Sequence, residues 1–333
     1  KGFGQPHAVA KAQQGATQLP LVLLAADIEP AAIHMSLDRN RHSVGGRRQR
    51  GVGRNRDDDF ACLGGLQGNT GSGLNRADAR MLAAMGVDLT TSDNGQEVEF
   101  NGPAELRGMR IDVPGDFSSA AFFIAGACIG NGGPVVIRNV GVNPTRTGVL
   151  DILKDMGADI SVDNVRLLGE EPVADLTVRP SRLVGIAVDP AKVPLAIDEF
   201  PLLFVAAACA EGKTTFTGIG ELRVKESDRI SAMADGLRAL SVPVEESEDG
   251  AVIHGGKVYG GKVDSRGDHR IAMSFAVAGT VAEWAVQISN TDAVARSFPG
   301  FERCLAALGT DITVTDRIEG GAWGRATTFR SLR

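Results

Sequence analysis

The pattern of apolar and polar residues repeats along residues 103–315. Three apolar segments rich in small residues each contain an aspartate at or near their start, and they span 115–127, 197–208 and 267–278. Aspartate is favoured at helix N-caps, because its carboxylate accepts hydrogen bonds from the unpaired N–H groups of the first turn. Helices that are apolar nearly all round are buried. The pattern therefore predicts three buried helices, each preceded by an aspartate.

Each predicted helix is followed by the same succession of elements. A short apolar strand comes next, at 134–140, 214–219 and 284–289. A second helix follows, and Gly157 and Gly309 fit the end of that helix, where a left-handed backbone is favoured. Each unit then has the order βαβαββ, with right-handed crossovers between parallel strands. We predict an α/β fold of βαβαββ repeats, an inside-out α/β barrel whose sheets surround the helices.

The two ends of the chain lack this regularity. Residues 1–79 contain ten lysines and arginines but one glutamate, and the tract 39–56 holds seven of the arginines. Three interpretations stay open for residues 1–79: a basic arm that binds nucleic acid, a disordered extension, or a frame-shifted stretch of coding sequence. The abrupt change of composition favours the frame shift. Residues 316–333 are predicted to form an irregular tail.

Composition and charge narrow the functional classes. The chain has 333 residues and a net charge of −6, so a general attraction to nucleic acid is not expected. No apolar run is long enough to span a membrane, and the first residues lack the features of a signal peptide, which predicts a cytoplasmic protein. The cysteines show no paired spacing, and we expect reduced thiols at Cys62, Cys128, Cys209 and Cys304.

The segment 221–229 is densely charged and directly follows a predicted strand. We interpret it as a tight turn and the first turns of a helix that continues to Leu240. Helix N-termini attract anions, whereas basic side chains there are repelled by the helix dipole. An anionic ligand would relieve that conflict. The alternative is a salt-bridged helix start that faces solvent.

Four segments together resemble the 5-enolpyruvylshikimate-3-phosphate (EPSP) synthase family, in the family's order and spacing. They are Asn-Pro-Thr-Arg-Thr-Gly at 143–148, Asp-Glu-Phe-Pro at 198–201, Glu-Leu-Arg-Val-Lys-Glu-Ser-Asp-Arg at 221–229 and Gly-Asp-His-Arg-Ile-Ala-Met at 267–273. The resemblance implies a two-domain fold with helix N-termini at the interdomain cleft. Residues 80–102 would be a remnant of the first domain, which is otherwise largely missing, and 103–315 the whole second domain.

The resemblance implies a reaction as well. The family transfers the enolpyruvyl group of phosphoenolpyruvate to the 5-hydroxyl of shikimate 3-phosphate and releases phosphate, in the biosynthesis of chorismate and aromatic amino acids. Both substrates carry a phosphate and a carboxylate, so several cations and helix N-termini have to share one cleft. The chemistry requires positioned acid–base groups but no metal, cofactor or covalent nucleophile. The expected partners are these two substrates, without nucleic acid or membrane, and the family is usually monomeric.

The resemblance assigns roles to individual residues. Asp198 would contact the shikimate hydroxyls and help to remove the proton, although an aspartate before a helix is in isolation an N-cap. Glu226 would transfer a proton at the methylene carbon, and Lys225 would bridge the charged groups of the two substrates. Arg229 and Arg270 would hold phosphoenolpyruvate with a bidentate geometry that lysine cannot reproduce.

Two more residues lie in or near family motifs. Arg296 stands directly before Ser-Phe-Pro, where the family often has a basic residue, and it is assigned to substrate binding. His269 belongs to the 267–273 motif, but in isolation it would be structural.

The sequence also departs from the family. Its first-domain motifs are absent, so half of the active site is missing, and a non-catalytic remnant of the synthase is an alternative. A second alternative is the related transferase that acts on UDP-N-acetylglucosamine, for whose reactive cysteine only Cys62 would be available. The helix end at 81–89 has no partner helix upstream, so we expect its apolar residues to form an exposed face: Met81, Leu82, Met85 and Leu89.

Overall fold

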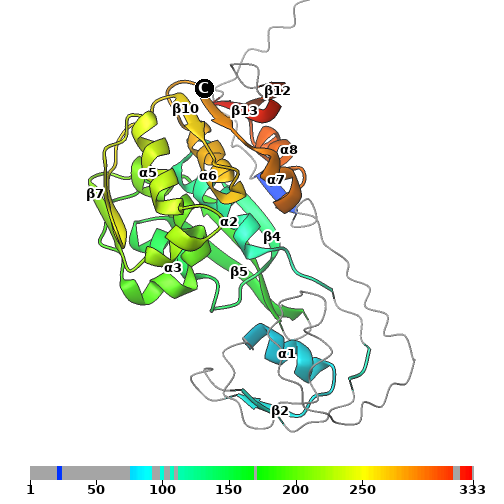
Figure 1. Ribbon diagram of the computed structural model, residues 1–333. Coiled ribbons are helices and arrows are strands. Elements are labelled where there is room, and N and C mark those ends of the chain that lie inside the picture. Colours follow the sequence, from blue (N-terminus) through cyan, green and yellow to red (C-terminus); the bar gives the residue numbers. More distant parts are fainter. Residues whose placement is uncertain are drawn as a thin grey trace, which may run out of the picture.

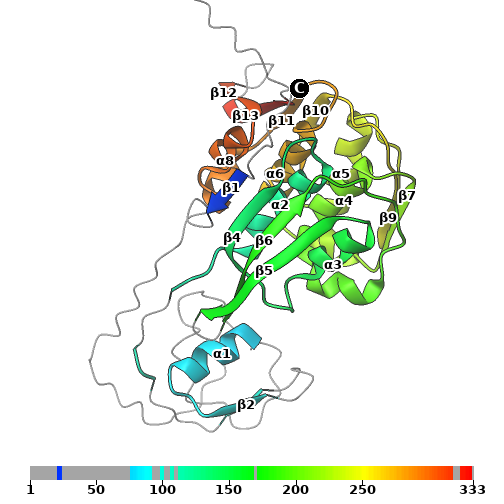
Figure 2. The same cartoon turned by 180° about the vertical axis from the view of Figure 1, so that it is seen from behind.

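The computed structural model describes residues 21–24, 76–91, 98–100, 106–108, 112–168, 171–317 and 323–331. The interpretations of residues 1–79 therefore fall mostly outside the described residues. Helix α1 (Arg76–Ala84) and strands β2 (Leu89–Thr91) and β3 (Val98–Phe100) lie apart from the main body (Figures 1 and 2). They are near the tip of the hairpin formed by β5 (Asp159–Leu168) and β6 (Glu171–Arg179).

From their first helix onward, the first two repeats follow the predicted order of helices and strands. The first contains α2 (Phe117–Ile129), β4 (Val135–Gly141), α3 (Gly148–Asp155), β5 (Asp159–Leu168) and β6 (Glu171–Arg179). The second contains α4 (Phe200–Cys209), β7 (Lys213–Thr217), α5 (Arg229–Ala239), β8 (Val244–Ser247) and β9 (Gly250–His254). Short 3₁₀ turns precede α4 and α5: η2 (Pro190–Leu195), η3 (Ile197–Glu199) and η4 (Gly220–Val224).

The third repeat has the same order, with its second helix divided in two. It contains β10 (Gly261–Asp264), α6 (His269–Gly279), β11 (Val286–Ser289), α7 (Asp292–Ser297), α8 (Phe301–Ala307), β12 (Thr310–Arg317) and β13 (Trp323–Ser331). Within the described ranges of the three repeats, the leading strand is seen in the third repeat, as β10, which pairs in parallel with β11. In the first two repeats, parallel bridges take its place: Gly115–Val140, Val184–Glu211 and Ala187–Thr215.

The three repeats give three sheets with a common strand order. The second hairpin strand of each repeat lies in the middle of its sheet, in the orders β4-β6-β5, β7-β9-β8 and β11-β13-β12. Strand β1 (Leu21–Leu24) pairs in parallel with β4, the position that β10 takes beside β11. A separate two-stranded sheet consists of β2 and β3.

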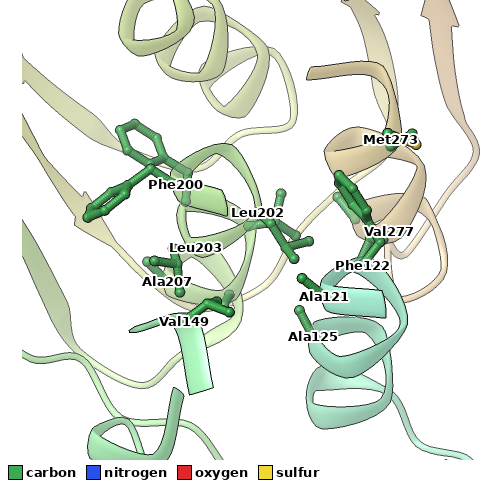
Figure 3. Close-up of a cluster of buried hydrophobic side chains, with 14 of the residues drawn as sticks. Ala121, Phe122, Ala125, Val149, Phe200, Leu202, Leu203, Ala207, Met273 and Val277 are labelled. Atoms are coloured by element: carbon green, nitrogen blue, oxygen red, sulfur yellow. The ribbon is translucent and has the colours of Figure 1, made fainter. Parts of the chain in front are cut away.

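Helices α2, α4 and α6 pack against one another in the core (Figures 2 and 3). Their residues are buried on nearly every face, as their apolar composition predicts. Figure 3 shows Ala121, Leu202 and Val277, one from each helix, among the buried side chains. Glycine allows a further close approach between α5 and α6, because a Cβ at Gly236 would lie 2.1 Å from the Phe275 ring.

The prediction of an irregular C-terminal tail is wrong for residues 323–331. Strand β13 pairs antiparallel with both β11 and β12, and Phe329 lies opposite Val286 on one side and Ile312 on the other. The side chains of Ala326, Thr327 and Phe329 are buried. This strand escapes sequence analysis because threonines and arginines interrupt its apolar pattern.

The expected exposed face on α1 is also wrong. Leu82 and Met85 are buried, and Met81 and Leu89 are half-buried. Arg80, in the middle of α1, forms an ion pair of 2.9 Å with Glu171 at the start of β6. No helix in the described part of the chain is long and apolar enough to cross a membrane.

Candidate functional site

The charged segment 221–229 contains the predicted turn, but only its last residue, Arg229, belongs to the helix that follows. It forms the 3₁₀ turn η4, leaves helical geometry at Lys225, and enters α5 only at Arg229. Asp228 is the N-cap of α5 and accepts a hydrogen bond of 3.0 Å from the Ser231 amide. Because this carboxylate takes up a free amide of the first turn, the helix begins there, and Lys225 and Glu226 are presented from the irregular backbone before it.

Arg229, the first residue of α5, is surrounded by carboxylates. Its side chain is 1% exposed, and its Nε lies 2.8 Å from Oδ2 of Asp268, which is itself fully buried. Its Nη1 lies 3.5 Å from Oδ1 of Asp198, and its Nη2 is hydrogen-bonded to Glu226. Each nitrogen of the guanidinium therefore has its own acidic partner, an arrangement that a lysine cannot make.

Asp198 brings the predicted cations together. Its Oδ1 lies 3.8 Å from Nζ of Lys225 and 3.5 Å from Nη1 of Arg229, and its Oδ2 lies 4.0 Å from Nη2 of Arg270. Lys225 also pairs with Glu221. The carboxylate of Asp198 remains 39% exposed, so it is both held by cations and open to a ligand.

Asp198 differs from the equivalent aspartates of the other repeats. Asp116 and Asp268 are N-caps, accepting hydrogen bonds of 2.8 Å from the amides of Ser119 and Arg270. Asp198 instead lies within η3, the 3₁₀ turn that precedes α4, and Glu199 is the N-cap residue. The N-cap interpretation therefore holds for two of the three aspartates and is wrong for Asp198, whose side chain is turned to the cations.

Asp268 and His269 show how charge and burial act at this site. Burial opposes ionisation of Asp268, but its hydrogen bond and attraction to Arg229, helped by the Arg270 amide and Ser227, outweigh burial and lower its pKa. Burial lowers the pKa of His269, and the charges of Arg270 and Arg229 add to that effect against the opposing Asp268. His269 is accordingly a neutral imidazole at physiological pH.

A second polar cluster, which sequence analysis did not assign, adjoins the first. Glu199 is 6% exposed, and its Oε1 accepts hydrogen bonds of 2.6 Å from Ser118 Oγ and 3.2 Å from Arg270 Nη1. Arg146 donates to Ser118 Oγ at 3.2 Å. Burial raises the pKa of Glu199, although Ser118, Arg270 and Arg146 oppose the rise and Asp198 adds to it.

Sequence signals for this cluster exist but are indirect. Glu199 and Arg146 lie inside the motifs at 198–201 and 143–148, and a charged residue inside an apolar helix start signals a buried partner. Within the 143–148 motif, Asn143 Oδ1 accepts hydrogen bonds from the Thr145 amide at 3.2 Å and its hydroxyl at 3.0 Å. This shapes the turn that carries Arg146.

Arg296 is not brought into either cluster. It lies in the last turn of α7, its side chain is exposed, and within the described part of the chain it forms no ion pair with the residues above. The described cysteines Cys128 and Cys209 form no disulfide bond. Burial raises the pKa of Cys128 and of Cys209 to about 12, so neither supplies a thiolate at neutral pH. Cys62 lies outside the described residues.

Comparison with known proteins identifies the family. The family profile described as EPSP synthase (3-phosphoshikimate 1-carboxyvinyltransferase) matches residues 70–305. The chain belongs to the EPSP synthase family. The 3-phosphoshikimate 1-carboxyvinyltransferase of Legionella pneumophila (strain Paris) is 57% identical over 222 residues, which are 67% of this chain and 51% of that protein. The enzyme of the same name from Methylococcus capsulatus is 53% identical over 236 residues, covering 71% and 54%.

Solved structures agree with the family assignment. An EPSP synthase from Acinetobacter baumannii matches with a TM-score of 0.67 and 50% identity, over 70% of this chain and 54% of that one. The enolpyruvyl transferase NikO from Streptomyces tendae, at 19% identity and a TM-score of 0.55, covers 71% of this chain and 52% of its own and shares the fold. The chain thus spans about half the length of the EPSP synthases it matches.

This member of the EPSP synthase family has five of its predicted site residues in one connected network. Asp198 joins Lys225, Arg229 and Arg270, and Arg229 joins Glu226. Among the described residues, no group of three or more histidines, cysteines, aspartates or glutamates is placed to hold a metal ion. The network can attract anions and exchange protons through its carboxylates.

Proposed function

We propose that this chain supplies half of an active site that transfers the enolpyruvyl group of phosphoenolpyruvate to the 5-hydroxyl of shikimate 3-phosphate, with release of phosphate. The observation that carries the proposal is the convergence of Lys225, Arg229 and Arg270 on the carboxylate of Asp198. The names and 50–57% identities of the EPSP synthase relatives support it. The relatives are about twice as long as the matched region, so the other half of the site belongs to sequence that this match does not cover.

The acid–base steps fall to two carboxylates. Asp198, held near Lys225 and Arg229, helps to take the proton of the attacking hydroxyl. Glu226, whose side chain is 58% exposed, transfers the proton at the methylene carbon of phosphoenolpyruvate. Glu226 is paired with Arg229. An anionic substrate at Arg229 would compete for that pair and leave the carboxylate free to exchange a proton.

The cations bind the substrate anions. Lys225 bridges the charged groups of the two substrates, and Arg229 and Arg270 hold phosphoenolpyruvate through their planar guanidinium groups. Arg296, whose exposed side chain lies outside the network, is assigned to substrate binding only by its place before Ser-Phe-Pro. The chemistry needs no metal or organic cofactor: in the addition the hydroxyl oxygen bonds to C2 of phosphoenolpyruvate as the methylene gains a proton, and in the elimination the C–O bond to phosphate breaks as the methyl group loses a proton.

The proposal extends to the architecture and setting of the chain. Residues 103–315 form the second domain as an inside-out α/β barrel, with α2, α4 and α6 inside and the three sheets outside. Residues 80–102 are the remainder of a first domain. We expect a monomer that acts in the cytoplasm and binds neither nucleic acid nor membrane. A non-catalytic remnant of the synthase stays the alternative function, whereas the family match favours the shikimate enzyme over the UDP-N-acetylglucosamine enzyme.

The proposal is tested by titrating the full chain with phosphoenolpyruvate in a calorimeter. Arg270→Lys keeps the charge but loses the bidentate geometry, and it is expected to weaken the binding of phosphoenolpyruvate by roughly tenfold. Arg266→Lys is the matched control, since Arg266 pairs with Asp235 on α5 outside the network. Equal affinities in Arg270→Lys and Arg266→Lys would contradict the assignment of Arg270.

A further inference from the structure

The buried carboxylate of Glu199, in the second repeat, is hydrogen-bonded to residues of the first and third repeats. Its partner Ser118 is the second residue of α2 in the first repeat, and its partner Arg270 is the second residue of α6 in the third. Glu199 itself is the N-cap residue of α4 in the second repeat. One carboxylate therefore ties together the N-terminal ends of the three core helices.

Glu199 does not act as an ordinary N-cap in this position. Its side chain makes no capping hydrogen bond to α4, the helix that it precedes. The two partners of its Oε1, at 2.6 and 3.2 Å, belong to other helices. A carboxylate that is 6% exposed is costly to bury, and it is tolerated only when charged or polar partners satisfy it. Its place is therefore set by Ser118 and Arg270.

The contacts of Arg270 show what Glu199 does to it. Nη1 donates to Oε1 of Glu199 at 3.2 Å and to the backbone oxygen of Asp198 at 3.0 Å. Nη2 has a longer contact, 4.0 Å from Oδ2 of Asp198. One side of the guanidinium is thus fixed by two acceptors of the protein, and the Nη2 side is left to meet a ligand. Because the guanidinium is planar and rigid, two acceptors at Nη1 restrict the orientation of the whole group.

We propose that Glu199 is a positioning residue, which together with Ser118 holds the Arg270 guanidinium so that its Nη2 side is presented to an anionic substrate. This inference rests on the proposed function for the identity of the substrate, phosphoenolpyruvate. Glu199 itself touches no substrate in this arrangement. Arg146, which donates to Ser118 Oγ at 3.2 Å, completes the chain of hydrogen bonds from the 143–148 turn to Arg270.

Two readouts on the full chain test the role of Glu199. In nitrogen NMR spectra of arginine-labelled protein, hindered rotation of the Arg270 guanidinium reports on its restraint without any ligand, and Arg270→Lys assigns the signal. Calorimetric titration with phosphoenolpyruvate reports on affinity. Glu199→Ala is expected to release the restraint and to weaken binding roughly tenfold, since a charge-assisted hydrogen bond is lost.

Two other variants separate positioning from general stability. Ser274→Ala removes a buried hydroxyl of α6 that has no hydrogen-bond partner among the described residues, and it is expected to match the parent in both readouts. Glu199→Gln keeps the length of the side chain and one acceptor but not the charge. It is expected to lower the affinity for phosphoenolpyruvate by about threefold. If Glu199→Ala does not fold, Glu199→Gln tests in its place whether Glu199 restrains Arg270.

The inference is overturned if folded Glu199→Ala, or Glu199→Gln in its place, keeps the Arg270 signal and the affinity of the parent. It is also overturned if Ser274→Ala reduces both as much as the Glu199 variant does. A parent chain that binds no phosphoenolpyruvate contradicts the proposed function instead. In that case the ligand-free NMR signal alone decides whether Glu199 restrains Arg270.

Discussion

Arg229 is the residue on which the charge balance of the site depends. It is 1% exposed, and its partner Asp268 is fully buried. Removing one member of a buried pair leaves an uncompensated charge in the protein interior, which costs more than the pair itself contributes. The same residue is proposed to bind a substrate anion, so stability and binding depend on one guanidinium.

Replacing Arg229 by methionine is expected to reduce the free energy of unfolding by about 3–5 kcal/mol, because Asp268 then remains buried without its cation. Urea denaturation measures this loss. Arg238→Met is the matched control on the same helix: Arg238 is 41% exposed and pairs with Asp235, and its loss is expected to cost at most about 1 kcal/mol. Equal losses in the two variants would contradict the account of Arg229.

Glu199 should give the stability of the chain a recognisable pH dependence. Burial raises its pKa in the folded chain above the value in the unfolded chain. The folded state therefore holds the proton more tightly, and the stability that this contributes at low pH is lost as the pH rises through the window between the two pKa values. In Glu199→Gln that loss is absent.

The free energy of unfolding of Glu199→Gln, relative to the parent, is thus expected to rise as the pH is increased from about 4 to about 7. Denaturation of both proteins across this range measures the difference. A difference that stays flat or falls with pH would show that burial does not control the ionisation of Glu199.

At the scale of elements, the sequence predicts those helices and helix caps that depend on the local pattern of residues. The apolar helices α2, α4 and α6 are found as expected, and so are the N-caps Asp116 and Asp268. Elements that depend on tertiary pairing were missed. Strand β13 is held between β11 and β12, and its threonines and arginines carry no apolar pattern strong enough to predict it.

Phe329 provides the test of this strand. Its side chain is buried, and it packs so closely on α6 that a Cβ at Gly279 would lie 2.6 Å from the Phe329 Cβ. Phe329→Ala is expected to cost about 3–5 kcal/mol of unfolding free energy through the cavity that it leaves. Thr328→Ala, next to it on the half-buried face, should cost about 1 kcal/mol or less. If Phe329→Ala left the free energy of unfolding unchanged, the packing of β13 in the core would be contradicted.

At the scale of the whole molecule, the threefold repetition of one unit explains where the site lies. Because α2, α4 and α6 pack together, the residues at their N-terminal ends meet, and Ser118, Glu199 and Arg270 come from different repeats. Sequence motifs predicted the network around Asp198, but not the partners of Glu199. Those contacts join residues 71 and 81 positions apart, and only the packing of the helices sets them.

The central claim is that Glu226 and the residues connected to it form half of an active site for enolpyruvyl transfer. It is tested most directly by joining the complete first half of the Legionella pneumophila relative to residues 80–333 and measuring phosphate release that depends on both substrates. The account predicts turnover, and Glu226→Gln should lower it at least ~100-fold, while Glu245→Gln, outside the network, should not. A folded chimera that releases no phosphate, or one in which Glu226→Gln is as active as its parent, would contradict the claim.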